Sequence, residues 1–414
     1  METLYFITES YPFETQELSF LHAEVAALSR RYDVTLLPFR AQSGPYVEPL
    51  PEGVRVELVR NRLPLEAYLP LVLFQRDFWR ELAEARRGSS FGAFARRVGV
   101  IWRHGARALR YQEALRAYLR RKNARGVLYF FWSTPETYAF ARMRMEFPAL
   151  RFIVRAHGYD LYREVTRFDW LPYRRRVDER LDRHLFVCAQ GRAYYLRLYG
   201  VADAARYSVA YLGCNGYEPA PPPAPDAPFT LVSCARAIPV KRLELIVRAL
   251  ALWPEARAVS WTYFGDGPLL PELRRLADEA ANPRVSINLR GRVPNAALGA
   301  EYAALRPHAL VNVSASEGLP VSMMEALSAG IPLVGTDVGG SRELIVGETG
   351  VLLPAELTPE ALCAALVAFS REPRARQLAR RAAARALWEE RYRASDCAEK
   401  TCKLIGGRLN GADS

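Results

Sequence analysis

Two glutamates, Glu317 and Glu325, stand eight residues apart where a predicted strand gives way to a predicted helix. Pro320 suits the first position of that helix and Gly330 suits its end. Glu317 therefore belongs to the preceding loop, and Glu325 lies within the helix. A carboxylate on so apolar a helix is costly to bury without hydrogen-bond donors, which sugar hydroxyls or a ribose would supply. In isolation, such a pair is more often a surface acid and a structural carboxylate.

Groups that suit a phosphate lie in the same half of the chain. The first turn of the predicted helix offers free backbone amides at Val321 and Ser322, together with the positive end of the helix dipole. Arg236 and Lys241 follow a strand predicted at 229–234. Arginine presents a planar fork of donors and lysine a compact charge, so the pair suits a diphosphate. Taken alone, they would be exposed basic residues before a helix.

Two further loops follow strands in this half. Gly265 and Asp266 belong to a Gly-Asp-Gly-Pro run, which is first of all a turn signal. Arg292 and Val293 follow the strand predicted at 285–289. Because the carboxyl ends of parallel strands meet at one edge of a sheet, we expect all four loops to gather there.

His157 follows a predicted strand in the first half of the chain and precedes Gly158 and Asp160. A lone histidine is usually a satisfied structural group, but the strand-end position and the glycine favour a place in a cleft. Glu14 and Thr15 follow the first predicted strand. The simpler interpretation of that pair is a cap on the first helix.

Short β-branched or aromatic runs alternate with helical patterns on both sides of a proline-rich stretch at 215–228. No helix or central strand tolerates that density of proline, so the stretch is predicted to be a linker. The alternation predicts an α/β chain of two Rossmann-like, parallel-sheet domains that face a cleft. These domains are 1–214, with a basic helical insert at 75–125, and 229–390. A helix and tail at 391–414 are expected to cross back to the first domain.

The motifs resemble those of glycosyltransferase family 4, whose members are retaining enzymes of the GT-B fold. The family's R-x4-K pattern matches Arg236 and Lys241, and its E-x7-E pattern matches Glu317 and Glu325. Its G-D-G-P and G-x-V loops match the two loops described above. The resemblance covers most of the chain and is strongest from residue 231 to residue 353.

The start of the chain departs from the common pattern. Many members carry a glycine pair after the first strand, where this chain has Pro12 followed by Glu14 and Thr15. There the chain resembles a branch of bacterial exopolysaccharide and capsule transferases. Contacts to an acceptor phosphate in this loop therefore do not follow from the common pattern.

The resemblance implies a role for each matched residue. Arg236 and Lys241 would clamp the donor diphosphate, Glu317 would contact the donor sugar near its reacting carbon, and Glu325 would hold the ribose. Arg292 and Val293 would border the base, and His157 would approach the donor sugar from the first domain. The remaining substrate contacts that we expect are Gly265, Asp266, Gly318, Leu319, Val321, Ser322, Glu14 and Thr15.

The reaction implied is metal-independent hexosyl transfer, with retention, from a UDP- or GDP-linked sugar to a hydroxyl of a saccharide or lipid-linked acceptor. Exopolysaccharide, capsule or lipopolysaccharide synthesis would be its setting. No cofactor is expected, because two cations already face the leaving diphosphate. The alternatives are a sugar-nucleotide epimerase or phosphorylase of the same fold, and a non-catalytic protein that binds nucleic acid or an anionic surface.

The formal net charge of +12 is concentrated in one region. Residues 75–125 hold fourteen Arg or Lys residues and four acids, with apolar residues recurring at helical spacing among them. This pattern is typical either of a core-packed helix with a solvated arginine face or of a surface that binds anionic lipid. No nucleic-acid-binding motif accompanies it, so we expect no nucleic-acid partner.

Several classes of protein are excluded by composition. No run of about 18 apolar residues occurs, and the acidic N-terminus lacks the features of a signal peptide. The expected location is cytoplasmic, with peripheral association at the inner membrane face as an extension. The six cysteines lack metal-binding spacing and are interpreted as free thiols, so no metal site is predicted.

Overall fold

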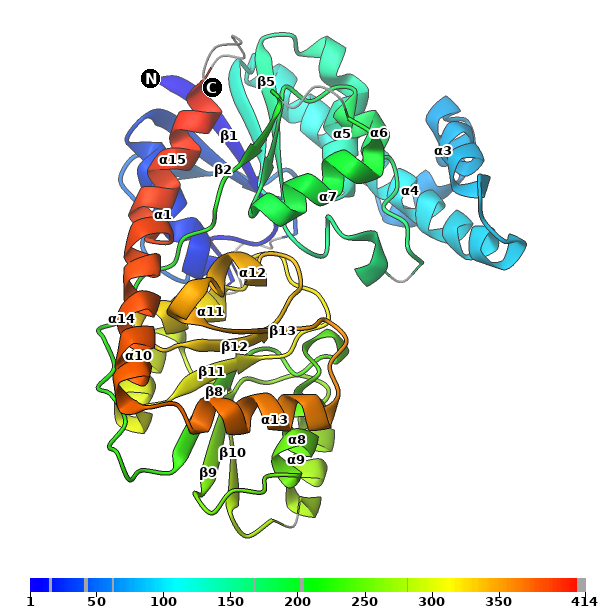
Figure 1. Cartoon of the computed structure of the whole chain (residues 1–414). Coiled ribbons are helices and arrows are strands. Elements are labelled where there is room, and N and C mark those ends of the chain that lie inside the picture. The colour runs from blue at the N-terminus through cyan, green and yellow to red at the C-terminus, as the bar shows by residue number, and fades with distance from the viewer. Residues whose placement is uncertain are drawn as a thin grey trace. The chain divides into compact units, whose positions relative to one another are not determined.

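The structure is a computed structural model that describes residues 1–14, 17–40, 44–61, 63–166, 168–201, 205–280 and 282–407 (Figure 1). Its contacts divide the chain into two compact units. Unit 1 comprises Met1–Tyr211 together with Ala398–Ser414, and unit 2 comprises Leu212–Cys397. The two α/β units predicted from the alternation of strands and helices are therefore present.

Unit 1 is built on a seven-stranded sheet whose neighbouring strands are all parallel. Its order is β3-β2-β1-β4-β5-β6-β7, and the order reverses between β1 and β4. Ligands of such sheets bind beyond the carboxyl ends of the strands at the reversal. The strands are β1 (Glu2–Thr8), β2 (Tyr32–Pro38), β3 (Arg55–Val56), β4 (Gly126–Phe130), β5 (Leu150–Ala156), β6 (Arg183–Phe186) and β7 (Tyr207–Val209). Strand β3 lies at one edge of the sheet and pairs with β2 alone. It has two residues, whereas the β-branched run at 54–59 predicts a strand of six.

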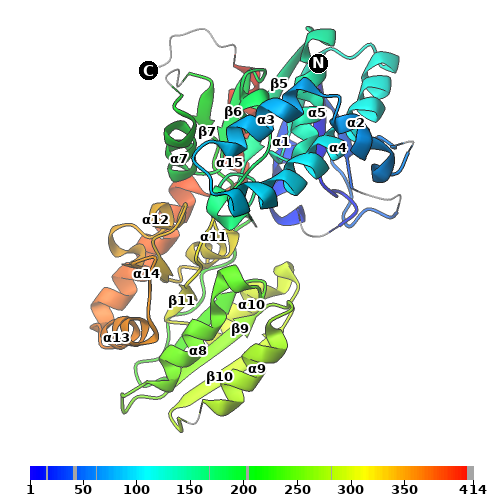
Figure 2. The same cartoon turned by 90° about the vertical axis from the view of Figure 1, so that its right-hand side faces the viewer.

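The helices of unit 1 include the predicted basic region. They are α1 (Leu18–Ser29), α2 (Leu69–Val72), α3 (Arg76–Arg86), α4 (Phe91–Arg121), α5 (Pro135–Met143), α6 (Arg174–Asp178) and α7 (Ala189–Tyr199). The region at 75–125 folds as α3 and α4, which pack together (Figure 2). The Ser90 hydroxyl caps α4 by accepting from the Ala93 amide, and Ile101, Leu115 and Leu119 are buried on its apolar face.

Unit 2 repeats the same architecture with six parallel strands in the order β10-β9-β8-β11-β12-β13. The strands are β8 (Phe229–Cys234), β9 (Val259–Phe264), β10 (Val285–Gly291), β11 (Ala309–Asn312), β12 (Leu333–Thr336) and β13 (Gly350–Leu353). Here the reversal falls between β8 and β11, so the loops that follow these two strands meet at the expected ligand position.

The helices of unit 2 cover both the sheet and its ligand edge. They are α8 (Leu243–Ala251), α9 (Leu270–Glu279), α10 (Asn295–Leu305), α11 (Val321–Ser328), α12 (Ser341–Leu344), α13 (Pro359–Ser370) and α14 (Arg374–Arg391). Helix α8 packs between α9 and α13, whereas α14 packs against α11 (Figure 1). The buried core includes Trp261 and Tyr263 of β9.

The last helix, α15 (Ala394–Gly406), begins in unit 2 and continues into unit 1, as predicted. Within unit 1, Glu399 pairs with Arg30 and Arg31 at 3.1 and 2.6 Å. The proline-rich stretch belongs to unit 2 and is held there, because the Ala220 amide donates to the Ala329 carbonyl at 2.9 Å. None of the helices in the described ranges combines the length and apolarity needed to cross a membrane.

Candidate functional site

The loop after β11 carries Glu317, and the structure surrounds its carboxylate with donors. Glu317 Oε1 lies 2.5 Å from Lys241 Nζ, 2.6 Å from the Ser314 hydroxyl and 3.2 Å from Asn312 Nδ2. The Glu317 side chain is 9% exposed and that of Lys241 is 20% exposed. The sequence motifs at 236–241 and 317–325 therefore meet at the reversal of the sheet, although their members are far apart along the chain.

Backbone contacts hold these two loops together. Arg242 adopts a left-handed conformation with φ of +48° and donates from Nε to the Val313 carbonyl at 2.7 Å. The Ala315 amide donates to the Val240 carbonyl at 2.8 Å. These bonds join the loop that presents Lys241 directly to the loop that presents Glu317.

A third loop, after β12, approaches Glu317 from the other side. Gly339 has φ of +51°, and a Cβ built there would lie 1.8 Å from the Glu317 carbonyl oxygen. The next residue, Gly340, donates its amide to the Gly318 carbonyl at 2.7 Å. Glycine is required at 339 both by its backbone conformation and by the close approach.

Glu325 lies on α11 and is 4% exposed. Its Oε1 accepts a hydrogen bond from Asn295 Nδ2 at 2.6 Å, and burial raises the pKa of its carboxyl to about 7. In the first turn of the same helix, Val321 and Ser322 are half-buried. Their amides precede the first intrahelical hydrogen bond, so they remain suited to donate to an oxyanion.

Arg236 is exposed on the loop after β8. The Gly-Asp-Gly loop lies under it: the Ala237 amide donates to the Asp266 carbonyl at 2.8 Å, and a Cβ at Gly265 would lie 1.9 Å from the Ala235 carbonyl oxygen. The Asp266 carboxylate accepts from the Gly267 amide at 2.7 Å. In this structure the loop thus supports the backbone that carries Arg236.

The other predicted contacts in unit 2 differ in exposure. Arg292 is exposed and Val293 is half-buried just after β10, while Gly318 is half-buried. Leu319 is 5% exposed, so its side chain belongs to the wall of the site. Asn295 was missed by sequence reasoning, because an asparagine at the start of a helix carries no signal of a partner 30 residues away.

His157 of unit 1 lies just beyond β5 and is buried. Its ring lies 4.0 Å from the ring of Trp132 and 4.5 Å from that of Phe131, measured between centroids. Burial lowers the pKa of the imidazole, so the ring is neutral at physiological pH. Nδ1 lies 3.8 Å from Asp160 Oδ2, and neither ring nitrogen makes a hydrogen bond of normal length among the described residues.

Glu17 was given no role from the sequence, yet it organises the loop after β1. Its carboxylate accepts from the amides of Ser10 and Tyr11 at 2.7 and 2.8 Å and from Trp132 Nε1 at 2.5 Å. The loop after β1 is therefore tied to the aromatic ring that covers His157. Of the two residues predicted to contact substrate here, Glu14 is exposed and Thr15 lies outside the described residues.

The described part of the chain contains no group of three or more His, Cys, Asp or Glu side chains placed to hold a metal ion. The six cysteines are free thiols, as expected from their spacing. The polar chemistry available in unit 2 is therefore that of two cations, two carboxylates and a helix N-terminus.

Comparisons with known proteins agree with this geometry. Residues 228–372 match the family model described as glycosyl transferases group 1. A segment of 155 residues is 34% identical to WcaL of Salmonella typhimurium, a protein named for colanic acid biosynthesis and glycosyl transfer. That match covers 36% of this chain and 37% of the length of this curated relative.

Two solved structures extend the likeness to nearly the whole chain. The lipopolysaccharide outer core galactosyltransferase WaaB, in its apo form, has a TM-score of 0.68 with 14% identity, over 97% of this chain and 99% of that chain. HepE of Anabaena, in complex with UDP and glucose, has a TM-score of 0.62 with 14% identity, over 99% and 100%. At these identities the likeness concerns the fold. Residues 228–372 therefore match the glycosyl transferases group 1 family, within a chain that has the GT-B fold.

Proposed function

We propose that the protein transfers a hexose from a nucleotide-diphosphate sugar to a hydroxyl of a saccharide or lipid-linked acceptor in bacterial polysaccharide synthesis. The observation that carries the proposal is the pairing of Lys241 with Glu317 beside the start of α11, at the strand reversal of unit 2. The family match of this unit and the names of its relatives support the same reaction class. HepE, which binds UDP and glucose, favours a UDP-linked donor as the first to test.

The proposed chemistry is mainly electrostatic. Arg236, Lys241 and the first-turn amides of α11 would stabilise the negative charge that develops on the leaving diphosphate. Glu317 would lie against the donor sugar and Glu325 against the ribose hydroxyls. Because two cations and a helix end already face the diphosphate, the proposal needs no metal ion.

We propose retention of configuration by a front-face displacement. The acceptor oxygen forms the new bond on the face that the diphosphate leaves, and the departing phosphate oxygen takes the acceptor proton. Glu317 lies in the loop before α11 and Glu325 lies within that helix, so both carboxylates belong to one side of the site. A glycosidase-type double displacement instead places its two carboxylates on opposite faces of the sugar. A glycosyl adduct trapped on Glu317, or an inverted product by NMR, would contradict this mechanism.

In unit 1, Nδ1 of the neutral His157 ring faces Asp160, and Nε2 makes no hydrogen bond among the described residues, so Nε2 is available to hydrogen-bond a sugar hydroxyl. We therefore keep His157 as a contact of the donor sugar. The remaining polar groups at the carboxyl edge of this sheet belong to the acceptor.

Donor binding is tested by thermal shift against UDP-, GDP-, ADP- and dTDP-linked sugars. Ligand at about 100 times its dissociation constant adds about 2.7 kcal/mol of stability. We expect one base to raise the melting temperature, and Arg236→Ala to abolish the shift. Arg248→Ala, which removes an exposed arginine from α8, is the matched control and should keep it. No response to any nucleotide would overturn the donor assignment.

We also propose that unit 1 associates with the anionic face of a membrane. Phe74, between α2 and α3, is 83% exposed, and Trp79 of α3 is 57% exposed, beside the exposed Arg76 and Arg80 of the same helix. Large apolar side chains next to arginines fit an interface where anionic headgroups lie above hydrocarbon. Such a location would bring the enzyme to a lipid-linked acceptor.

A further inference from the structure

A cavity of about 290 Å³ opens in unit 1 beside the carboxyl ends of β4 and β5. It is lined by the residues that follow these strands, including Ser133, Thr134 and Asp160, and by residues of α4. Three guanidinium groups contribute to its wall, those of Arg40, Arg107 and Arg174. The cavity therefore lies at the ligand edge of unit 1 and is rich in fixed donors.

Arg174 is buried and makes no ion pair with an acidic side chain of the described residues, although the buried Asp160 carboxylate lies near enough to interact electrostatically with its charge. Its side chain donates to the Ser133 hydroxyl and, at 2.9 Å, to the Asp160 carbonyl oxygen, while Nε has no partner. The nearby Asp160 carboxylate accepts instead from the amides of Ser133 and His157, at 2.8 and 2.7 Å. Burying a cation among neutral acceptors is costly, and a bound anion would offset that cost.

Thr134 gives an independent indication of a ligand. It occupies the N-cap of α5, is 7% exposed and lines the cavity. Threonine at this position normally caps the helix with its hydroxyl, but here the side chain makes no cap hydrogen bond. The hydroxyl has no partner at all among the described residues, so it is a buried donor left for a ligand.

The two other arginines of the wall are held in place by carboxylates behind them. Arg40 pairs with Glu9, and Arg107 Nη2 lies 3.0 Å from Glu136 Oε1. Their charges are partly compensated, but each guanidinium has five N–H donors and its carboxylate partner uses at most two. These arginines are thus positioned donors around Arg174, whose Nε has no hydrogen-bond partner among the described residues.

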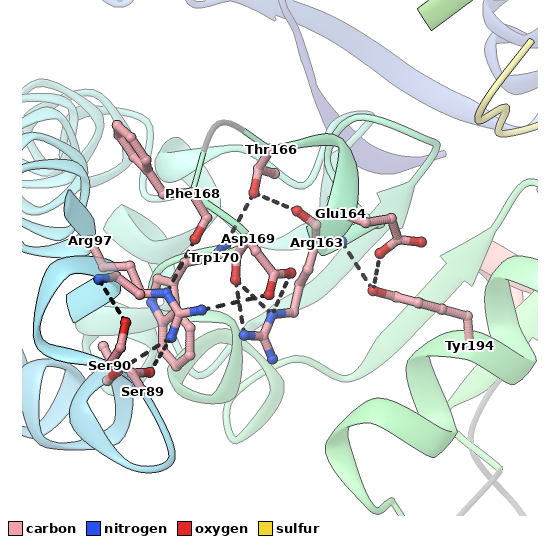
Figure 3. A network of polar contacts seen from close by, with 12 residues as sticks. Ser89, Ser90, Arg97, Arg163, Glu164, Thr166, Phe168, Asp169, Trp170 and Tyr194 are labelled. Atoms are coloured by element: carbon pink, nitrogen blue, oxygen red, sulfur yellow. Dashed lines mark hydrogen bonds and ion pairs between the residues drawn. The ribbon is translucent and has the colours of Figure 1, made fainter.

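Arg174 also lines a larger neighbouring cavity of about 600 Å³. There Arg97 and Arg163 lie over the ring of Trp170, at 5.0 and 4.8 Å from its centroid, and both pair with Asp169 (Figure 3). Trp170 borders both cavities. An aromatic wall beside a cluster of arginines suits a sugar ring that carries a negative charge.

We propose that the cavity at Arg174 and Thr134 binds an oxyanion, either a phosphate ester or a carboxylate, carried by the acceptor saccharide. The assignment of this ligand as the acceptor rests on the function proposed above, whereas the oxyanion site itself rests on the structure of unit 1 alone. The acceptor of this enzyme is then an anionic saccharide, with its charged group at Arg174 and Thr134 and a neighbouring ring against Trp170.

The test uses three monosaccharide probes of similar size: glucose 1-phosphate, glucuronate and glucose. Binding to the full-length protein is measured by calorimetry, with UDP at saturation and again without UDP, so that binding at the donor site is recognised. Thr134→Val removes the buried hydroxyl at nearly constant shape. Thr262→Val is the matched control, because its hydroxyl is also buried and unpartnered but lies on β9 of unit 2.

We expect glucose 1-phosphate or glucuronate to bind at least about tenfold more tightly than glucose, and the tighter of the two identifies the oxyanion. Thr134→Val should weaken that probe about tenfold, while Thr262→Val should leave its affinity unchanged. Equal binding of charged and neutral probes, or equal effects of the two variants, would overturn the site. A nucleotide response without an oxyanion response defeats this inference alone. An oxyanion response without any nucleotide response defeats the donor assignment and leaves the site standing.

Discussion

Lys241 is not an isolated cation at the proposed diphosphate site, because its ammonium group pairs with the Glu317 carboxylate at 2.5 Å. A diphosphate that binds here must share Lys241 with that carboxylate. Glu317 thus has two effects, since it positions the lysine and also competes with the ligand for it.

We therefore predict that Glu317→Gln separates donor binding from turnover. The amide keeps an acceptor for Asn312 and Ser314 but no longer neutralises Lys241, so UDP should bind about fivefold more tightly. Transfer should fall by about 100-fold or more, because the group facing the reacting carbon has lost its charge. Calorimetry with UDP and a single-turnover assay measure the two effects. Weaker UDP binding would contradict the competition.

The Glu325 carboxyl carries the second prediction at this scale, because burial raises its pKa to about 7 from an ordinary value near 4.5. The folded state binds this proton more tightly than the unfolded state does. The free energy of unfolding therefore falls as pH rises from about 4.5 to about 7 and levels off above that range. Ionised Glu325 destabilises the protein at high pH.

Glu325→Gln removes this titration while keeping an acceptor for Asn295. Relative to the wild type, the variant should gain about 2–3 kcal/mol of stability between about pH 5 and about pH 8. Urea titrations at the two pH values measure the difference. Because Glu81 of unit 1 also has a raised pKa of about 7, only the difference between the two proteins isolates Glu325. An identical pH slope in both would show that folding does not raise the pKa of Glu325.

The positions of the motif residues were predictable from the sequence. Arg236, Lys241 and Glu317 lie in segments that follow strands and Glu325 lies within α11, and parallel topology brings such segments together. Glu17 was not predictable, because its role depends on two backbone amides and a tryptophan ring that only folding assembles.

At the scale of elements, the loops after β11 and β12 depend on one another through Gly339. An alanine there combines a left-handed backbone with a Cβ 1.8 Å from the Glu317 carbonyl oxygen, so the Glu317 loop must shift. Gly347 offers a matched control, since its φ is +53° and a Cβ there would meet no atom within 4 Å.

We predict that Gly347→Ala costs about 1 kcal/mol of stability, which is the backbone penalty alone. Gly339→Ala should cost about 3 kcal/mol, because it adds the clash, and it should also abolish the thermal shift with UDP. Denaturation and thermal shift measure both quantities. Equal costs for the two variants would mean that the loops are not coupled.

The alternation of strands and helices was readable from the chain because fully buried parallel strands are short apolar runs between turns. Strand order was not readable in the same way. Pairing such as β1 with β4 joins segments more than 100 residues apart, and it depends on which helix covers which face. The short length of β3, two residues, was not predictable for the same reason, because an edge strand ends where its pairing with its single neighbour ends.

The whole molecule carries a net charge of +12, but much of the charge in 75–125 is compensated locally. Arg107 pairs with Glu136, and Arg116 and Arg120 pair with Glu146, an acid outside the basic window. The solvated-face interpretation therefore holds for the middle and end of α4. It does not account for Trp79 of α3 or for Phe74 just before this helix, which are exposed among arginines.

If that end of unit 1 binds a membrane, the whole protein should sediment with vesicles that contain anionic lipid at low salt, and high salt should release it. Phe74→Ser should reduce partition about tenfold, because one large aromatic side chain leaves the hydrocarbon boundary. Leu252→Ser is the matched control, since Leu252 is a 48% exposed apolar residue of unit 2. Equal partition into neutral and anionic vesicles would show that the arginines do not contribute to membrane binding. Equal losses in the two variants would show that Phe74 does not insert into the membrane, which would contradict the proposed membrane surface.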